Sequence, residues 1–81
     1  MKILVIRLSS IGDIVLTSPV VRVLKKQLNA EVHFLTKKTF AKWLSHNPYI
    51  DTIHHYEDGV QPLQTEGYDF VVDLHHNLRS L

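Results

Sequence analysis

Four short apolar runs alternate along the chain with segments whose apolar positions follow helical spacing. The apolar runs predict strands at residues 2–8, 31–36, 50–56 and 68–74. The segments between them predict helices at 12–28 and 39–46, and a short helix or loop at 60–66. Strands that alternate with helices are typical of a parallel α/β sheet with right-handed crossovers. We therefore expect a Rossmann-like sheet with the doubly wound strand order 3-2-1-4.

The first predicted helix contains a proline that divides its pattern. Its apolar residues Ile14, Val21, Leu24 and Leu28 share one helical face. Pro19 removes one main-chain hydrogen bond and should kink a continuous helix. Alternatively, Ser18 caps a new helix and Pro19 takes the first helical position. We favour one kinked helix.

The composition excludes several classes of protein. An apolar fraction of 44% argues against disorder, and a formal charge of +1 gives no general basis for nucleic-acid binding. The chain has no cysteine, no apolar run of about 20 residues and no signal-peptide pattern, so we expect a cytoplasmic protein. Covering both faces of a parallel sheet normally takes about 100 residues or more. We therefore expect these 81 residues to be an N-terminal piece of a larger protein.

The turn after the first strand holds the strongest candidates for chemistry, because ligands of open α/β sheets bind at the carboxyl ends of strands. It contains Arg7, Ser9, Ser10, Gly12 and Asp13. Asp13 is either a general base or an ordinary first-turn aspartate. The turn has one glycine and neither common nucleotide-binding pattern. The order 3-2-1-4 would bring this turn close to residues 73–79.

Two further groups of side chains leave alternatives open. The chain has six histidines, and two adjacent pairs, 54–55 and 75–76, lie at or just after the ends of predicted strands. Adjacent strand residues point to opposite faces, so neither pair predicts a metal site. Residues 37–43 combine three lysines with Phe40 and Trp43. Such a segment forms either core contacts with a solvated basic face, or a surface for a membrane or an anionic acceptor.

The order of short motifs resembles the glycosyltransferase family that includes the lipopolysaccharide heptosyltransferases, glycosyltransferase family 9. That family opens with a strand, a basic residue, S-x-G-D and a helix that often carries T-x-P. The matching residues here are Arg7, Ser9 or Ser10, Gly12, Asp13, Thr17 and Pro19. Further matches are AEVHFL at 30–35, NPYID at 47–51, YDFVVDL at 68–74 and LRS at 78–80. The resemblance spans essentially the whole chain, although many members have lysine where this chain has Arg7.

The resemblance implies part of the N-terminal, acceptor-side domain of a two-domain GT-B enzyme. Such an enzyme would move heptose from ADP-heptose to a lipid-linked, anionic lipopolysaccharide core acceptor with inversion, without a cofactor or required metal. Asp13 would be the catalytic base, and Arg7 and Arg79 would help to hold the acceptor, together with Ser9, Ser10 and Gly12 of the turn. The donor-binding domain is missing, so we expect the fragment alone to be inactive.

The same features allow two further expectations. An enzyme with a lipid-linked acceptor would lie in the cytoplasm, with peripheral contact to the inner membrane left open. An uncovered fourth strand would be a sheet edge through which the fragment self-associates.

The rival interpretation is a complete α/β binding or regulatory module similar to a receiver domain, with Asp73 as its acidic site.

Overall fold

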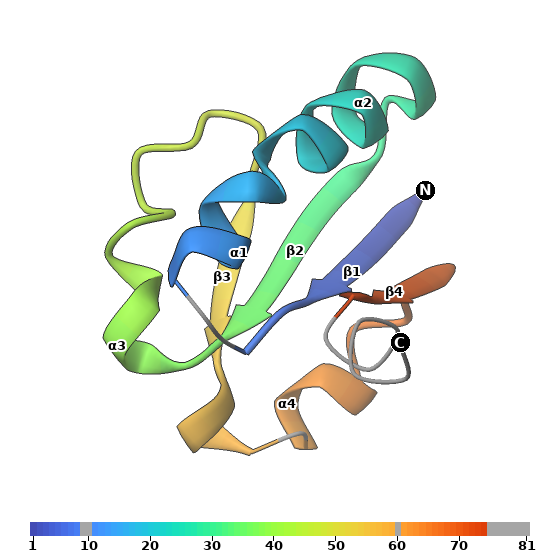
Figure 1. The fold of residues 1–81 in the computed structure, drawn as a ribbon. Helices are drawn as coiled ribbons and strands as arrows, with labels where there is room; N and C mark the ends of the chain where they lie inside the picture. The colour runs from blue at the N-terminus through green and yellow to red at the C-terminus, as the bar shows by residue number, and fades with distance from the viewer. Residues whose placement is uncertain (9–10, 60, 75–81) are drawn as a thin grey trace.

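A computed structural model describes residues 1–8, 11–59 and 61–74, which form one parallel sheet with flanking helices (Figure 1). The strands are β1 (Lys2–Ile6), β2 (Glu31–Thr36), β3 (Thr52–His55) and β4 (Phe70–Asp73), in the order β3-β2-β1-β4. All three strand pairs are parallel. The predicted order is confirmed. The receiver-like alternative is wrong about topology, because a receiver domain would place its third strand beside the first.

One face of the sheet packs against α1 (Ile11–Leu16) and α2 (Ser18–Leu28), which run along it (Figure 1). Alternation along the strands directs Ile3, Val5 and Phe34 to this face, where all three are almost completely buried. Ile14 of α1 and Val21 of α2 complete this core from the helix side. Asn29, in the left-handed conformation with φ of 50°, ends α2 and turns the chain into β2.

The segment 12–28 forms two helices, so the prediction of one kinked helix is wrong. The break lies at Thr17, whose main-chain N–H and hydroxyl both donate to the carbonyl of Ile14. Pro19 lies in the first turn of α2, where its missing N–H costs nothing. The second helix therefore begins one residue before the alternative predicted, with Thr17 instead of Ser18 at the cap position.

The segment from β2 to β4 contains shorter elements than the pattern predicts. The predicted helix at 39–46 is α3 (Lys38–Ala41), followed by turns, and β3 covers four residues of the predicted strand at 50–56. A 3₁₀ turn, η1 (Tyr56–Asp58), follows β3. The segment at 61–64 resolves to a single helical turn, α4 (Gln61–Gln64).

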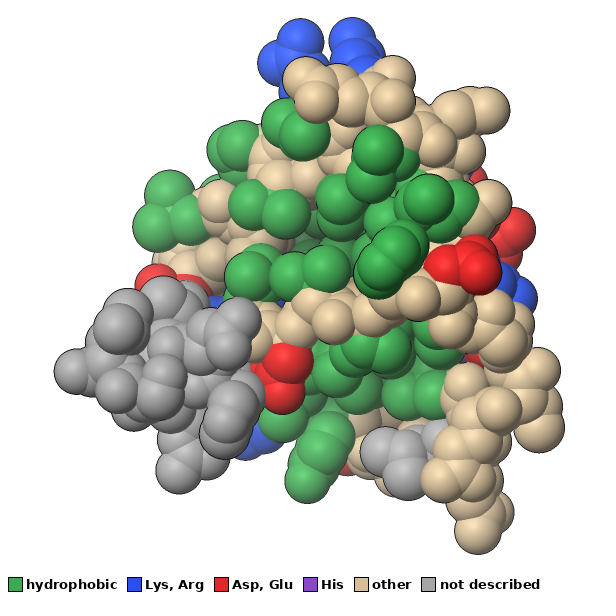
Figure 2. All heavy atoms as spheres, turned by 90° about the vertical axis from the view of Figure 1, so that its right-hand side faces the viewer, with side chains coloured by type: hydrophobic (Ala, Val, Ile, Leu, Met, Phe, Trp, Pro, Cys, Tyr) green, Lys and Arg blue, Asp and Glu red, His purple; other side chains and the backbone are tan. Residues whose placement is uncertain are grey.

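The opposite face of the sheet is covered only in part within the described residues. Leu63 of α4 packs on Leu4 and Leu35 and forms a small second core. The fourth strand is an uncovered edge of the described sheet, as expected from the sequence: Phe70 and Val71 remain 57% and 56% exposed. Because β4 is the outermost strand beside β1, few described residues are placed to cover it. Figure 2 looks toward the side of the molecule where β4 forms the sheet edge and shows hydrophobic side chains spread across it.

Candidate functional site

The first candidate site lies where β1 and β4 end side by side. The main-chain N–H of Arg7 donates to Leu35, which carries Arg7 one residue beyond β1 in line with the sheet. Its side chain is 7% exposed and lies close to two groups from different segments. The guanidinium forms an ion pair with Asp13 at 2.7 Å and donates to the carbonyl of Leu74 at 3.3 Å. Arg7 therefore joins the start of α1 to the end of β4.

Asp13 occupies the first turn of α1 and keeps 46% of its side chain exposed. The neighbouring guanidinium and the helix N-terminus both favour the ionised carboxylate. This carboxylate is thus paired with a buried cation, while nearly half of its side chain is exposed to solvent. Such a group can accept a proton from a hydroxyl that approaches the carboxyl edge of the sheet.

Two buried polar atoms of this edge have no hydrogen-bond partner in the described part of the chain. They are Arg7 Nε and the hydroxyl of Thr36, which ends β2. Buried polar groups are usually satisfied by protein, water or ligand. Both atoms belong to residues at strand ends, where α/β proteins place their ligands.

The structure brings together only part of the predicted site. Arg7 and Asp13 are in contact, and Leu74 adjoins them, as the strand order predicts. Gly12 is exposed and open space surrounds the position of an added Cβ, so packing does not require glycine there. The predictions for Ser9, Ser10 and Arg79 lie outside the described residues, as does the histidine pair at 75–76.

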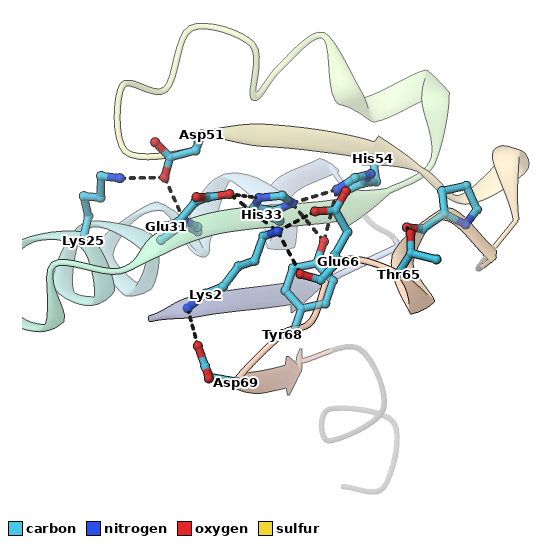
Figure 3. Close-up of polar contacts among 12 residues, drawn as sticks. Lys2, Lys25, Glu31, His33, Asp51, His54, Thr65, Glu66, Tyr68 and Asp69 are labelled. Atoms are coloured by element: carbon cyan, nitrogen blue, oxygen red, sulfur yellow. Dashed lines mark hydrogen bonds and ion pairs between the residues drawn. The ribbon is translucent and has the colours of Figure 1, made fainter.

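A second polar cluster, which the sequence analysis did not predict, lies on the sheet face that α4 partly covers (Figure 3). We call it the histidine cluster: His33 of β2, His54 of β3, and Glu66 and Tyr68 of the segment before β4. Ring nitrogens of His33 and His54 lie 2.9 Å apart, and the Tyr68 hydroxyl is 2.9 and 3.1 Å from them. Strand alternation could have shown that His33 and His54 share this face.

Burial and neighbouring charges shift the pKa values in the histidine cluster. Burial, and then the adjacent His33, lower the pKa of His54. Burial, followed by the carboxylates of Glu66 and Glu31, raises the pKa of Tyr68 to about 12. The Lys2 ammonium donates to Glu66 at 2.6 Å; this hydrogen bond lowers the pKa of Glu66 and raises that of Lys2. At neutral pH the phenol of Tyr68 is therefore a hydrogen-bond donor.

A groove of about 740 Å³ separates α2 from residues 43–49. Its apolar lining includes Pro19, Val23 and Trp43, and its cationic side chains include Arg22 and Lys26. The two aromatic residues of the predicted basic segment have different roles: Phe40 packs against the main core, whereas Trp43 is 56% exposed. Part of this segment is therefore a core contact, and part lines a surface groove.

The strand order and the covering helices define a Rossmann-like α/β domain with its polar site at the carboxyl edge of the sheet. The fold matches the crystal structure of "the glycosyl transferase family 9 from Veillonella parvula DSM 2008" with a TM-score of 0.80. The match has 23% sequence identity and covers 91% of this chain, which spans 25% of that protein. No protein-family model and no curated protein sequence matches the chain. Among the described helices, none is long and apolar enough to cross a membrane.

Proposed function

We propose that this chain is the acceptor-side part of the N-terminal domain of an inverting GT-B glycosyltransferase. The observation that carries the proposal is the Arg7–Asp13 pair at the carboxyl edge of a sheet that shares its fold with a glycosyltransferase. The motif resemblance narrows the proposed reaction to transfer of heptose from ADP-heptose to a lipopolysaccharide core acceptor. The donor would be bound mainly by a second domain, so these residues alone would be inactive.

In the proposed reaction, an acceptor hydroxyl oxygen attacks the anomeric carbon of the donor sugar. The new C–O bond forms on the face opposite the departing diphosphate, so the configuration inverts. Asp13 accepts the hydroxyl proton, which makes the oxygen more nucleophilic as the bond forms. Arg7 holds the Asp13 carboxylate in place at 2.7 Å, while donors from the second domain would stabilise the leaving diphosphate.

The groove beside α2 supports the lipid-linked character of the proposed acceptor. An apolar floor with Val23 and Trp43 and cationic side chains such as Arg22 and Lys26 suits an amphiphilic anion. With a lipid-linked acceptor, we expect the protein to act in the cytoplasm, in peripheral contact with the inner membrane. In this proposal the groove binds the lipid-linked acceptor, and Arg79 is a further contact to its anionic groups.

The test is steady-state sugar transfer by the full-length protein with Asp13→Asn, once the reading frame beyond Leu81 is known. Loss of the base should lower turnover by about 10²–10⁴-fold and leave the KM of the donor nearly unchanged. The matched control is Asp58→Asn, because the Asp58 side chain is 71% exposed and its described ion pair joins it to His55. Turnover within a few-fold of the parent would remove Asp13 from the base role. A reading frame that stops at Leu81 would oppose the transferase.

A further inference from the structure

The histidine cluster draws its side chains from three segments that are far apart in the sequence (Figure 3). The parallel register of β2 and β3 pairs Leu35 with His54, which places His54 diagonally beside His33 on the same face. The chain before β4 then passes under this face and adds Glu66 and Tyr68. One ligand atom from each of His33, His54 and Glu66 lies within 4.8 Å of the other two.

The Glu31 carboxylate determines the tautomer of His33, and therefore which of its ring nitrogens has a free lone pair. It lies 2.6 Å from His33 Nε2, and an ionised carboxylate can only accept, so the Nε2–H donates to it. In the neutral ring, Nδ1 is then unprotonated and points toward His54 Nε2 and the Tyr68 hydroxyl. Histidines that bind a metal ion through one ring nitrogen usually donate the N–H of the other nitrogen to a carboxylate or carbonyl, as His33 does here.

Three polar atoms that can each bind a cation meet in this cluster. His33 Nδ1, His54 Nε2 and the Tyr68 oxygen are separated by 2.9, 2.9 and 3.1 Å. The Tyr68 hydroxyl supplies one proton, and the single in-plane lone pair of Nδ1 faces two neighbours. When His54 is in the tautomer with the proton on Nδ1, its Nε2 also has a lone pair, and one cation could accept the lone pairs of both rings. His33 is 3% exposed, so water competes poorly for its nitrogen.

We propose that His33 Nδ1, His54 Nε2 and the Glu66 carboxylate form a site for a divalent transition metal ion such as Zn²⁺. Two nitrogens on a tetrahedral zinc ion lie about 3.3 Å apart, so the observed 2.9 Å needs only a small opening. The Tyr68 hydroxyl, or a water in its place, completes four ligands. The bound ion would connect β2, β3 and the segment before β4, far from the Arg7–Asp13 pair in sequence and on another part of the sheet.

The Lys2 ammonium would compete with the metal ion for the Glu66 carboxylate. It donates to Glu66 at 2.6 Å and thereby occupies the carboxylate that the ion would use. Glu31 lies 4.0 Å from the same ammonium, so Lys2 keeps a carboxylate partner when Glu66 turns to the metal. Replacement of Lys2 by a neutral side chain should therefore strengthen metal binding, which a merely structural role of the cluster would not produce.

The test is calorimetric titration of Zn²⁺ into the untagged, chelator-treated chain, together with Co²⁺ absorption spectroscopy. We expect one ion per chain, a tetrahedral Co²⁺ spectrum, and a thermal midpoint that rises with Zn²⁺. His54→Asn and Glu66→Gln should each weaken binding by at least about tenfold. The matched control His55→Asn should not, because His55 lies on the other face of β3 beside Asp58. Lys2→Met should bind more tightly than the parent.

Two results would overturn the proposal. The first is a parent chain that binds neither ion at high micromolar concentration. The second is equal Zn²⁺ affinity in the parent and in folded His54→Asn, which would locate binding at other histidines. If circular dichroism shows that His54→Asn is unfolded, Lys2→Met decides: unchanged or weaker Zn²⁺ binding by this variant would contradict the assigned ligand set.

Discussion

The ion pair between Arg7 and Asp13 should contribute measurably to the stability of the 81-residue chain. Asp13→Asn keeps the size of the side chain and suits the first turn of a helix, so its main effect is removal of the negative charge. Arg7, which is 7% exposed, would then keep a buried positive charge with the Leu74 carbonyl as its other described partner. An uncompensated buried charge is the costly part of such a change.

The expected magnitude follows from the unequal burial of the two partners. Exposed ion pairs contribute about 0.2–1 kcal/mol, whereas removing one partner of a fully buried pair costs about 3–5 kcal/mol. Asp13 is 46% exposed and Arg7 is almost buried, so the free energy lost with this pair should lie between the values for exposed and fully buried pairs. We expect Asp13→Asn to lower the free energy of unfolding by about 1–2 kcal/mol. In a domain of this size that is a fall in Tm of about 5–15 °C.

Urea unfolding followed by circular dichroism measures this difference directly. Asp58→Asn is the control and should change stability by less than about 0.5 kcal/mol, because its side chain is 71% exposed. Arg7→Met combined with Asp13→Asn should destabilise less than the sum of the two single changes, since no buried charge then remains. A loss below about 0.3 kcal/mol in Asp13→Asn, or strictly additive changes, would refute the assigned coupling.

Two further predictions concern the ends of the sheet. Burial raises the pKa of Asp51, but hydrogen bonds from Lys25 and the Val32 N–H outweigh it, and the net pKa lies below the usual 3.8. Asp51 therefore stabilises the fold above pH 3.8 and loses this effect as the pH falls through its folded pKa, so Asp51→Asn should lose less stability than the parent between pH 7 and pH 3. Urea unfolding at both pH values measures this loss, and an equal loss in the parent and the variant would contradict the prediction. The outermost strand β4, with Phe70 and Val71 exposed, should let the chain self-associate at high micromolar concentration, and Val71→Lys should reduce the sedimenting mass. A parent chain that sediments as a monomer throughout would exclude this contact.

Hydrophobic patterning determined the number of strands. Period-two alternation in 31–36 predicts β2 with the bounds that the structure has, and directs Phe34 inward. The strand order followed from connectivity, because right-handed crossovers leave few alternatives. Once that order was expected, the approach of Arg7 to the end of β4 followed as well. These features depend on short segments and on the order of strands and helices, so they can be predicted from the sequence.

Other features depended on contacts between segments far apart in the chain. The sequence allowed either one kinked helix or two, and the hydrogen bonds of Thr17 to Ile14 decided for two. The exposure of β4 depends on neighbours that the local apolar pattern does not contain, and Phe70 is exposed at the edge of the described sheet.

The histidine cluster is the clearest case of a feature that only the tertiary structure decided. The sequence shows six histidines, and attention to adjacent pairs misses the pair that meets in space. The pairing of Leu35 with His54 fixes the offset between β2 and β3, and the path of the chain before β4 brings Glu66 and Tyr68 beneath them. Register and loop path minimise the free energy of the whole domain, so no short segment encodes them alone.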